Sequence, residues 1–182
     1  MMPIGPLMIE HRWIERVIGG LQRRLDEPSS PRTFDALYVT RLVDFLRTYA
    51  DRCHHGKEED ILFRDLSDKG LGTELREVMN QLTAEHEWAR ATTKQLVLAN
   101  AALASGDETA HGDVGRLLSD LASFYPTHIQ KEDDGFFRPA MTYLTPAEQD
   151  AMLGEFIRFD ASLIHEKYRR IAGELEFEVA GS

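Results

Sequence analysis

Two short segments of the chain each place a glutamate four residues after a histidine. They are His54-x-x-x-Glu58 and His128-x-x-x-Glu132. Residues four apart lie on one face of an α-helix, about one turn from each other, so each pair can present an imidazole and a carboxylate to the same place. Imidazole and carboxylate together suit first-row transition metals, iron and zinc included. A single pair of this kind is common on solvated helix faces, so its surroundings decide what it means.

The surroundings of the two pairs are repeated as well. Glu10-His11-Arg12-Trp13 recurs as Glu85-His86-Glu87-Trp88, and the ten residues from His54 recur in the ten from His128. Each half of the chain therefore has a lone histidine followed by His-x-x-x-Glu. A duplication alone explains the similarity. It does not explain why both copies keep histidine and glutamate where a core favours leucine.

Apolar residues recur at three- and four-residue spacing almost throughout, and no segment alternates convincingly as a strand would. We expect five helices. The first carries a stripe from Leu7 to Leu25 and is broken by Pro28-Ser29-Ser30-Pro31, and the second runs from about Thr33 to Leu66. The third ends near Ser105-Gly106, and the fourth begins between Asp107 and Asp113 and ends at about Phe137, before Pro139. The fifth opens with a Thr145–Glu148 capping box and runs to about Ile171.

These helices predict an all-α fold, an up-down-up-down four-helix bundle with an additional C-terminal helix. A chain of 182 residues suits a single domain, residues 1–182. The bundle is expected over about 6–141 and the fifth helix over about 146–171. Phe156, Phe159 and Leu163 give that helix an apolar side to lay against the bundle.

The histidines and glutamates fall within the apolar stripes of the four bundle helices. If those stripes face inward, four imidazoles and two carboxylates meet along the bundle axis. Buried unpaired carboxylates are costly, so they need a compensating cation. The sequence therefore predicts a metal site made of six residues: His11, His54, Glu58, His86, His128 and Glu132.

The order His, His-x-x-x-Glu, His, His-x-x-x-Glu resembles the hemerythrin-like, HHE cation-binding family. The match covers about Pro6 to Phe137 and includes the apolar residues after each glutamate. The resemblance implies two iron ions, oxo- or hydroxo-bridged, with both carboxylates bridging them. It also implies binding or sensing of a small oxidant, namely dioxygen, nitric oxide or peroxide. The alternative is a di-iron redox enzyme or an iron-homeostasis or repair factor, and whether the chain turns over a substrate stays open.

The chain departs from oxygen-carrying hemerythrins at one position. Those proteins have a second histidine one turn after the third-helix ligand, where this sequence has Arg90. Two irons with about six ligands each would keep two open positions with four histidines and one with five. His55 is the best candidate for a fifth, because it adjoins His54. It also points about 100° away around an α-helix, so an exposed His55 is an equal alternative.

Two other kinds of site fit the pattern less well. A ferritin-like oxidase would need Glu-x-x-His on two helices. No glutamate stands three residues before any of the four histidines of the predicted site. A structural zinc site normally uses about four ligands in a closed tetrahedron, fewer than the six here.

Composition bounds the remaining functions. The formal net charge of −10 argues against a nucleic-acid or anionic-membrane surface. No apolar run reaches the roughly 18 residues of a transmembrane helix, and the first residues lack a basic signal-peptide region, so we expect a cytoplasmic protein. The expected partner is a small diatomic or peroxide ligand, and no protein partner is specified. Structural or surface roles are expected for Cys53, His111, Tyr125 and His165.

Overall fold

The computed structural model describes residues 2–26 and 34–180, and their side chains except those of residue 164 and residues 166–180. Within these ranges every regular element is a helix, as expected for an all-α fold. The elements in chain order are α1 (Ile4–Asp26), α2 (Ala36–Phe45), η1 (Leu46–His55), η2 (Glu58–Phe63), α3 (Arg64–Ser67), α4 (Thr73–Ala104), α5 (Ala110–Gln130), η3 (Lys131–Phe136), α6 (Phe137–Met141) and α7 (Pro146–Ala180).

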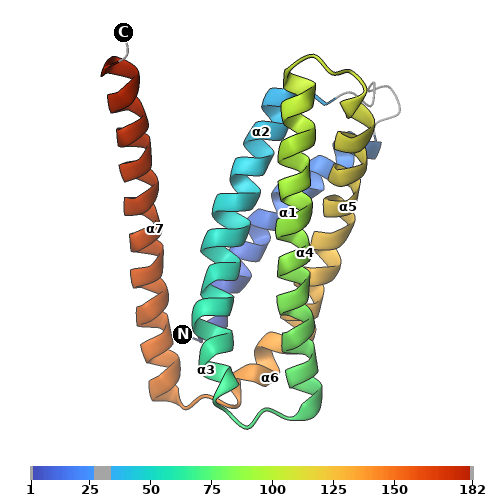
Figure 1. Ribbon diagram of the computed structural model, residues 1–182. Coiled ribbons are helices and arrows are strands. Elements are labelled where there is room, and N and C mark those ends of the chain that lie inside the picture. The colour runs from blue at the N-terminus through green and yellow to red at the C-terminus, as the bar shows by residue number, and fades with distance from the viewer. Residues whose placement is uncertain (1, 27–33, 181–182) are drawn as a thin grey trace.

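Four long helical rods form the bundle and alternate in direction along the chain (Figure 1). The first rod is α1. The second is the continuous run from α2 through η1 and η2 to α3, the third is α4, and the fourth runs from α5 through η3 to α6. The fifth helix, α7, stands beside the bundle on the side of the second rod and is closest to it near its own beginning. This is the expected bundle with an additional C-terminal helix.

Local sequence explains where several helices start. The side chain of Asp35 accepts a hydrogen bond from the backbone N–H of Leu37 at 3.0 Å, which caps α2. The expected start at Thr33 lies outside the described residues. At α7 the capping box is confirmed, because the Glu148 carboxylate accepts from the backbone N–H of Thr145 and the Thr145 hydroxyl accepts from that of Glu148.

Two expected helix ends were wrong. The fourth rod continues past Pro139 to Met141, because a proline in the first turn of α6 loses no hydrogen bond that the helix needs. The fifth helix continues past Ile171 to Ala180. A single glycine such as Gly173 costs a helix only about 1 kcal/mol relative to alanine, which is too little to end it.

The largest departure from regular α-helix lies in the second and fourth rods. The segments η1, η2 and η3 are π-helical, with hydrogen bonds that span one residue more than in an α-helix. They contain or adjoin both His-x-x-x-Glu motifs. A π-turn holds more residues than an α-turn, so neighbouring side chains diverge by a smaller angle.

Two apolar clusters fill the bundle, one on each side of a polar layer. Toward α3 and α6 the core includes Leu62, Leu82 and Phe136, and toward the other end it includes Ile18, Leu96 and Leu121. On each rod the predicted site residues fall between members of the two clusters. Polar side chains that must meet in the bundle are therefore enclosed by apolar packing above and below.

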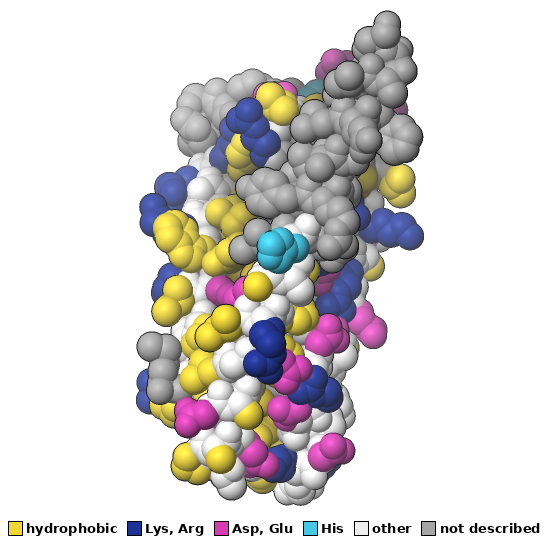
Figure 2. Space-filling view, turned by 90° about the vertical axis from the view of Figure 1, so that its left-hand side faces the viewer, with side chains coloured by type: hydrophobic (Ala, Val, Ile, Leu, Met, Phe, Trp, Pro, Cys, Tyr) yellow, Lys and Arg dark blue, Asp and Glu magenta, His cyan; other side chains and the backbone are white. Residues whose placement is uncertain are grey.

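The first half of α7 packs against the second rod. Phe156 is buried in the core and Phe159 lies against Gly56, where an added Cβ would come within 2.8 Å of the Phe159 ring. A side chain at position 56 would force the Phe159 ring to shift, so the glycine just after η1 favours this close approach of α7. On the side of the molecule where α7 lies, the described side chains of both charge signs are interspersed with hydrophobic ones (Figure 2). Among the described residues no helix is both long enough and apolar enough to cross a membrane.

Candidate metal centre

Seven buried side chains meet in the polar layer and form two groups. In each group the potential ligand atoms all lie within 4.8 Å of one another. The first group comprises His11, His54, Glu58 and Glu132, and the second comprises His55, His86 and His128. The structure therefore brings together all six residues of the predicted site and adds His55. None of the seven is more than 2% exposed.

His55 joins the site because of the π-helical backbone. An exposed His55 is excluded, since the residue is only 1% exposed. Its ring stacks on that of His86, with the centroids 3.9 Å apart and the planes at 12°. In η1 the angle between His54 and His55 is narrower than in an α-helix, so both rings turn toward the bundle axis. His55 thus lies beside His86 in the buried layer. Arg90, one turn after His86, instead pairs with Asp51 and Glu59.

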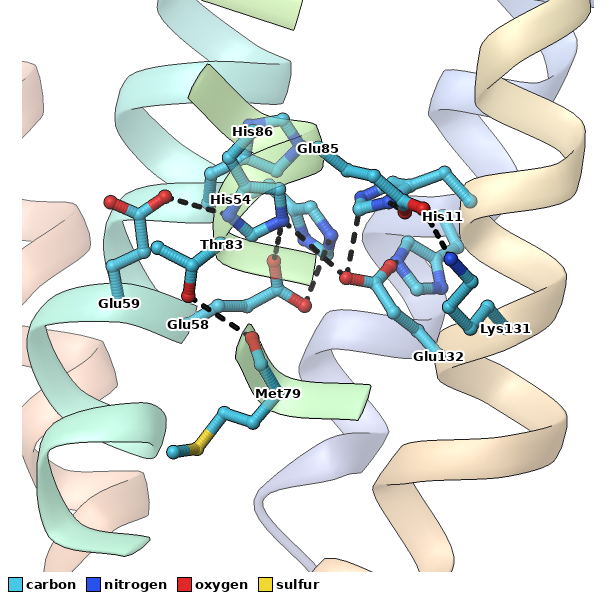
Figure 3. A network of polar contacts seen from close by, with 12 residues as sticks. His11, His54, Glu58, Glu59, Met79, Thr83, Glu85, His86, Lys131 and Glu132 are labelled. Carbon is cyan, nitrogen blue, oxygen red and sulfur yellow. Dashed lines mark hydrogen bonds and ion pairs between the residues drawn. The ribbon is translucent and has the colours of Figure 1, made fainter. Parts of the chain in front are cut away.

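Each buried carboxylate reaches both histidine groups (Figure 3). One oxygen of Glu58 lies 3.6 Å from Nε2 of His54 and the other lies 3.4 Å from Nε2 of His86. One oxygen of Glu132 lies 3.1 Å from Nε2 of His11 and the other lies 3.3 Å from Nε2 of His128. The two carboxylates therefore span the gap between the groups, as bridging ligands would.

The inward-facing atoms of this layer have no hydrogen-bond partner in the protein. They are the Nε2 atoms of all five histidines and all four oxygens of Glu58 and Glu132. Buried polar atoms are nearly always satisfied, and orphaned acceptors that converge on two points fit cations placed at those points. The donor set, imidazole with carboxylate, is one that first-row transition metals accept.

The outward-facing Nδ1 atoms of four histidines are held by a second layer of carboxylates. His54 contacts Glu10 at 3.0 Å, His128 contacts Glu85 at 2.8 Å, His86 contacts Glu59 at 2.6 Å and His11 contacts Asp133 at 2.8 Å. Carboxylates in this position fix the tautomer, so that Nδ1 carries the proton and Nε2 is free to bind a metal.

This second layer follows the sequence repeat and was missed at the sequence level. The glutamate before each lone histidine, Glu10 or Glu85, supports the His-x-x-x-Glu histidine of its own half. The acidic residue after each inward glutamate, Glu59 or Asp133, supports the lone histidine of the other half. An acidic residue at the same place in both copies is the signal that could have revealed it.

Cations balance the second layer. Lys57 pairs with Glu10, Lys131 with Glu85, and Arg12 with Asp133. The fourth pair joins Arg90 to Glu59 at 2.8 Å, and Arg90 also reaches Asp51 at 2.7 Å. Arg90, which stands where oxygen-carrying hemerythrins have a histidine, thus binds a carboxylate of the second layer.

The electrostatics of the inner layer favour a cation. Burial raises the pKa of Glu58 and of Glu132 well above the usual carboxyl range. Burial also lowers the pKa of His54 and His55 well below the usual range, and that of His128 to about 4. Imidazoles that stay neutral keep a lone pair for a metal, and a bound cation would let the two carboxylates ionise.

The residues expected to have other roles lie outside the inner layer. Burial raises the pKa of the Cys53 thiol to about 12, so little reactive thiolate forms at neutral pH. Tyr125 is buried in the apolar cluster toward Leu121, as a packed bundle residue. His111, near the start of α5, contacts Glu108 of the preceding turn at 3.1 Å, and His165 is exposed.

Comparison with known proteins agrees with this geometry. A family model described as the hemerythrin HHE cation-binding domain matches residues 2–140. Two mycobacterial proteins described as uncharacterized, Mb2018 of Mycobacterium bovis and Rv1995 of Mycobacterium tuberculosis, are each 24% identical over 176 residues. The match covers 94% of this chain but only 63% of each relative. No solved structure matches the chain significantly. Because the family model spans most of the chain and includes every residue of the buried layer, the chain belongs to the hemerythrin HHE cation-binding family.

Proposed function

We propose that the chain holds two iron ions between its two histidine groups and uses them to bind or sense dioxygen, nitric oxide or peroxide. The observation that carries the proposal is the reach of Glu58 and Glu132, each of which presents one oxygen to either group. Carboxylates placed in this way suit a pair of cations better than a single ion. Iron at these positions would supply redox chemistry toward small oxidants.

The number of available ligands supports binding rather than turnover. The group of His55, His86 and His128, with one oxygen from each carboxylate and one bridging oxygen, would complete about six positions. The group of His11 and His54, counted in the same way, lacks one. A single open position favours holding one small oxidant, whereas two would also admit solvent. This supports an oxidant-binding or sensing role over the alternative di-iron redox enzyme or iron-homeostasis factor.

A zinc site is the main competing assignment. Structural zinc is normally enclosed by about four ligands, and catalytic zinc by three protein ligands and a water. Seven buried side chains, two of which reach both groups, exceed either set.

We place the protein in the cytoplasm in this proposal, because its lone Cys53 leaves the fold independent of disulfide formation.

Metal analysis and spectroscopy of the purified protein test the proposal. After anaerobic iron loading and oxidation, we expect close to two irons per chain and near-ultraviolet absorption from a coupled ferric pair, with a zinc-loaded sample as the silent control. The reduced protein should then react rapidly with dioxygen, nitric oxide or peroxide in stopped-flow mixing. One iron or less per folded chain would contradict the paired site. Two irons that react with none of the three oxidants would contradict the oxidant role.

A further inference from the structure

A cavity of about 340 Å³ lies beside His55, between η1 and α4, with Tyr125 of α5 in its wall. Its inner end is formed by the buried His55, and its outer end by the exposed side chains of Arg47 and Lys94. A water molecule in the liquid takes about 30 Å³, and organic ligands occupy pockets of about 300 Å³ or more. The cavity is therefore much larger than a diatomic needs and has room for an organic molecule of several heavy atoms.

The cavity lies on the side of the centre that has three histidines. That group would be fully coordinated when occupied, whereas the group of His11 and His54 retains the open position. The cavity is thus separate from the place proposed for the small oxidant.

The charge of the lining selects an anion. Arg90 is engaged by Asp51 and Glu59. Arg47 and Lys94, by contrast, have no ion-pair or hydrogen-bond partner among the described residues. Three basic residues and one acidic residue line this cavity in a chain whose formal net charge is −10. Unpaired cations at the mouth of a pocket favour a carboxylate, which can accept hydrogen bonds from both.

The walls between the two ends are largely apolar. Leu46, Ala89 and Val97 line them. Arg47 and His55 are eight residues apart on one rod, which corresponds to about 10–12 Å along a helix. A ligand that spans the cavity therefore has a charged head, an apolar body and a length of about 10 Å.

We infer that this cavity binds a medium-chain organic carboxylate, with its head group held by Arg47 and Lys94 and its apolar chain directed toward His55. The inference goes beyond oxidant binding, and it stands whether or not the iron centre reacts with an oxidant. It also explains why two basic side chains without partners flank an apolar cavity in an acidic protein.

Isothermal titration calorimetry of the iron-loaded protein with octanoate tests the inference, with acetate and 1-octanol as probes of the head and the chain alone. We expect octanoate to bind at least about tenfold more tightly than either. The double variant Arg47→Ala/Lys94→Ala should weaken octanoate binding about tenfold. Val97→Trp, which fills the cavity, should abolish it. The matched control is Arg76→Ala/Arg116→Ala, which removes the same charge from exposed positions outside the cavity and should bind octanoate as the wild type does.

The inference is overturned if octanoate binds no better than acetate and 1-octanol, or if both double variants weaken it equally. Iron content and oxidant reactivity measured on the same samples separate this failure from failure of the proposed function. If the protein holds two irons but does not bind octanoate, only the inference of an organic ligand is contradicted. If it binds octanoate but reacts with none of the oxidants, only the proposed oxidant role is contradicted.

Discussion

His55 is the least tightly held imidazole of the centre. Its Nδ1 lies 3.6 Å from Asp51, whereas the other four histidines each have a carboxylate oxygen within 3.0 Å. Asp51 is itself shared with Arg90. His55 is thus positioned mainly by its stacking on His86 and by the π-helical backbone.

Removal of the His55 imidazole should therefore open the three-histidine side. In His55→Ala we expect iron to be lost to a chelator at least about tenfold more readily, because loss of outer-layer partners alone costs about 10–100-fold in metal affinity. The ferric absorption should change and autoxidation should accelerate, since two positions would then be open. His111→Ala, which alters a histidine far from the centre, is the control. An unchanged spectrum and autoxidation rate in His55→Ala would remove His55 from the ligands.

Alanine substitutions at Glu58 and at its neighbour Glu59 should affect iron binding differently. Glu58→Ala removes a carboxylate that reaches both histidine groups, so we expect no more than one iron per chain. Glu59→Ala leaves the inner layer intact but removes the carboxylate that holds His86, so two irons should remain with about 10–100-fold weaker affinity. Elemental analysis and chelator competition distinguish the two. Loss of the pair in Glu59→Ala with retention in Glu58→Ala would contradict the assignment.

At the scale of the helices, Lys57 and Lys131 occupy corresponding positions of the repeat but different environments. Lys57 is fully buried, and its ammonium group contacts Glu10 and, at 2.7 Å, Asp160 of α7. Among the residues whose side chains the structure describes, Lys131 pairs only with Glu85, and both partners are 28% exposed. The additional helix therefore makes the two halves unequal, because α7 reaches the centre through Asp160, Lys57, Glu10 and His54.

This asymmetry predicts unequal losses of stability. Removing one partner of a buried ion pair costs about 3–5 kcal/mol, and we expect about 2–3 kcal/mol for Lys57→Met because Asp160 is partly exposed. Lys131→Met should cost less than about 1 kcal/mol, as for other exposed pairs. Urea unfolding of both variants at equal iron occupancy measures the difference. Equal losses would show that the contact with α7 does not stabilise the bundle.

The helices and the inward placement of the six site residues could be predicted from sequence, whereas the angles between side chains within the π-helical segments could not. Periodicity and the repeat suffice for the bundle and for the six inward residues from His11 to Glu132. The direction of His55 depends on hydrogen bonds that span an extra residue in η1, and regular α-helical phase places that ring about 100° from His54. The burial of Lys57 could not be predicted from the sequence either, since it depends on where α7 packs against the second rod.

At the scale of the whole molecule, the two halves of the repeat are interlocked. Glu59 of the first half holds His86 of the second, and Asp133 of the second holds His11 of the first. The inner carboxylates likewise connect histidines from both halves. Neither half can complete a metal-binding group alone, so metal binding and the packing of the whole bundle are coupled.

This coupling predicts how metal-free and iron-loaded protein differ with pH. In the metal-free state the pKa values of Glu58 and Glu132 are raised above the ordinary value of 4.5, so both carboxyls keep protons that the unfolded chain has lost. Their contribution to stability is complete below pH 4.5 and declines as pH rises toward the folded pKa values. The pKa values of His54, His55 and His128 are lowered below 6.5, so below that pH the unfolded chain takes up protons that the folded chain does not.

Between pH 4.5 and 6.5 the two contributions oppose each other, and the three histidines outweigh the two carboxyls until about a third of the unfolded imidazoles have lost their protons. We therefore expect the free energy of unfolding of the metal-free protein to be highest at about pH 6 and to fall on both sides. Iron should abolish the fall between pH 6.5 and 8.5, because the bound cations keep Glu58 and Glu132 ionised in the folded state. It should steepen the fall on the acidic side, because protons then compete with the metal for the imidazoles. Urea unfolding of chelator-treated and iron-loaded samples between pH 5.5 and 8.5 measures both effects. If the metal-free protein kept constant stability from pH 6.5 to 8.5, the two inner carboxyls would not be the protonated groups that burial makes them here, and the need for cations between the histidine groups would lose its electrostatic basis.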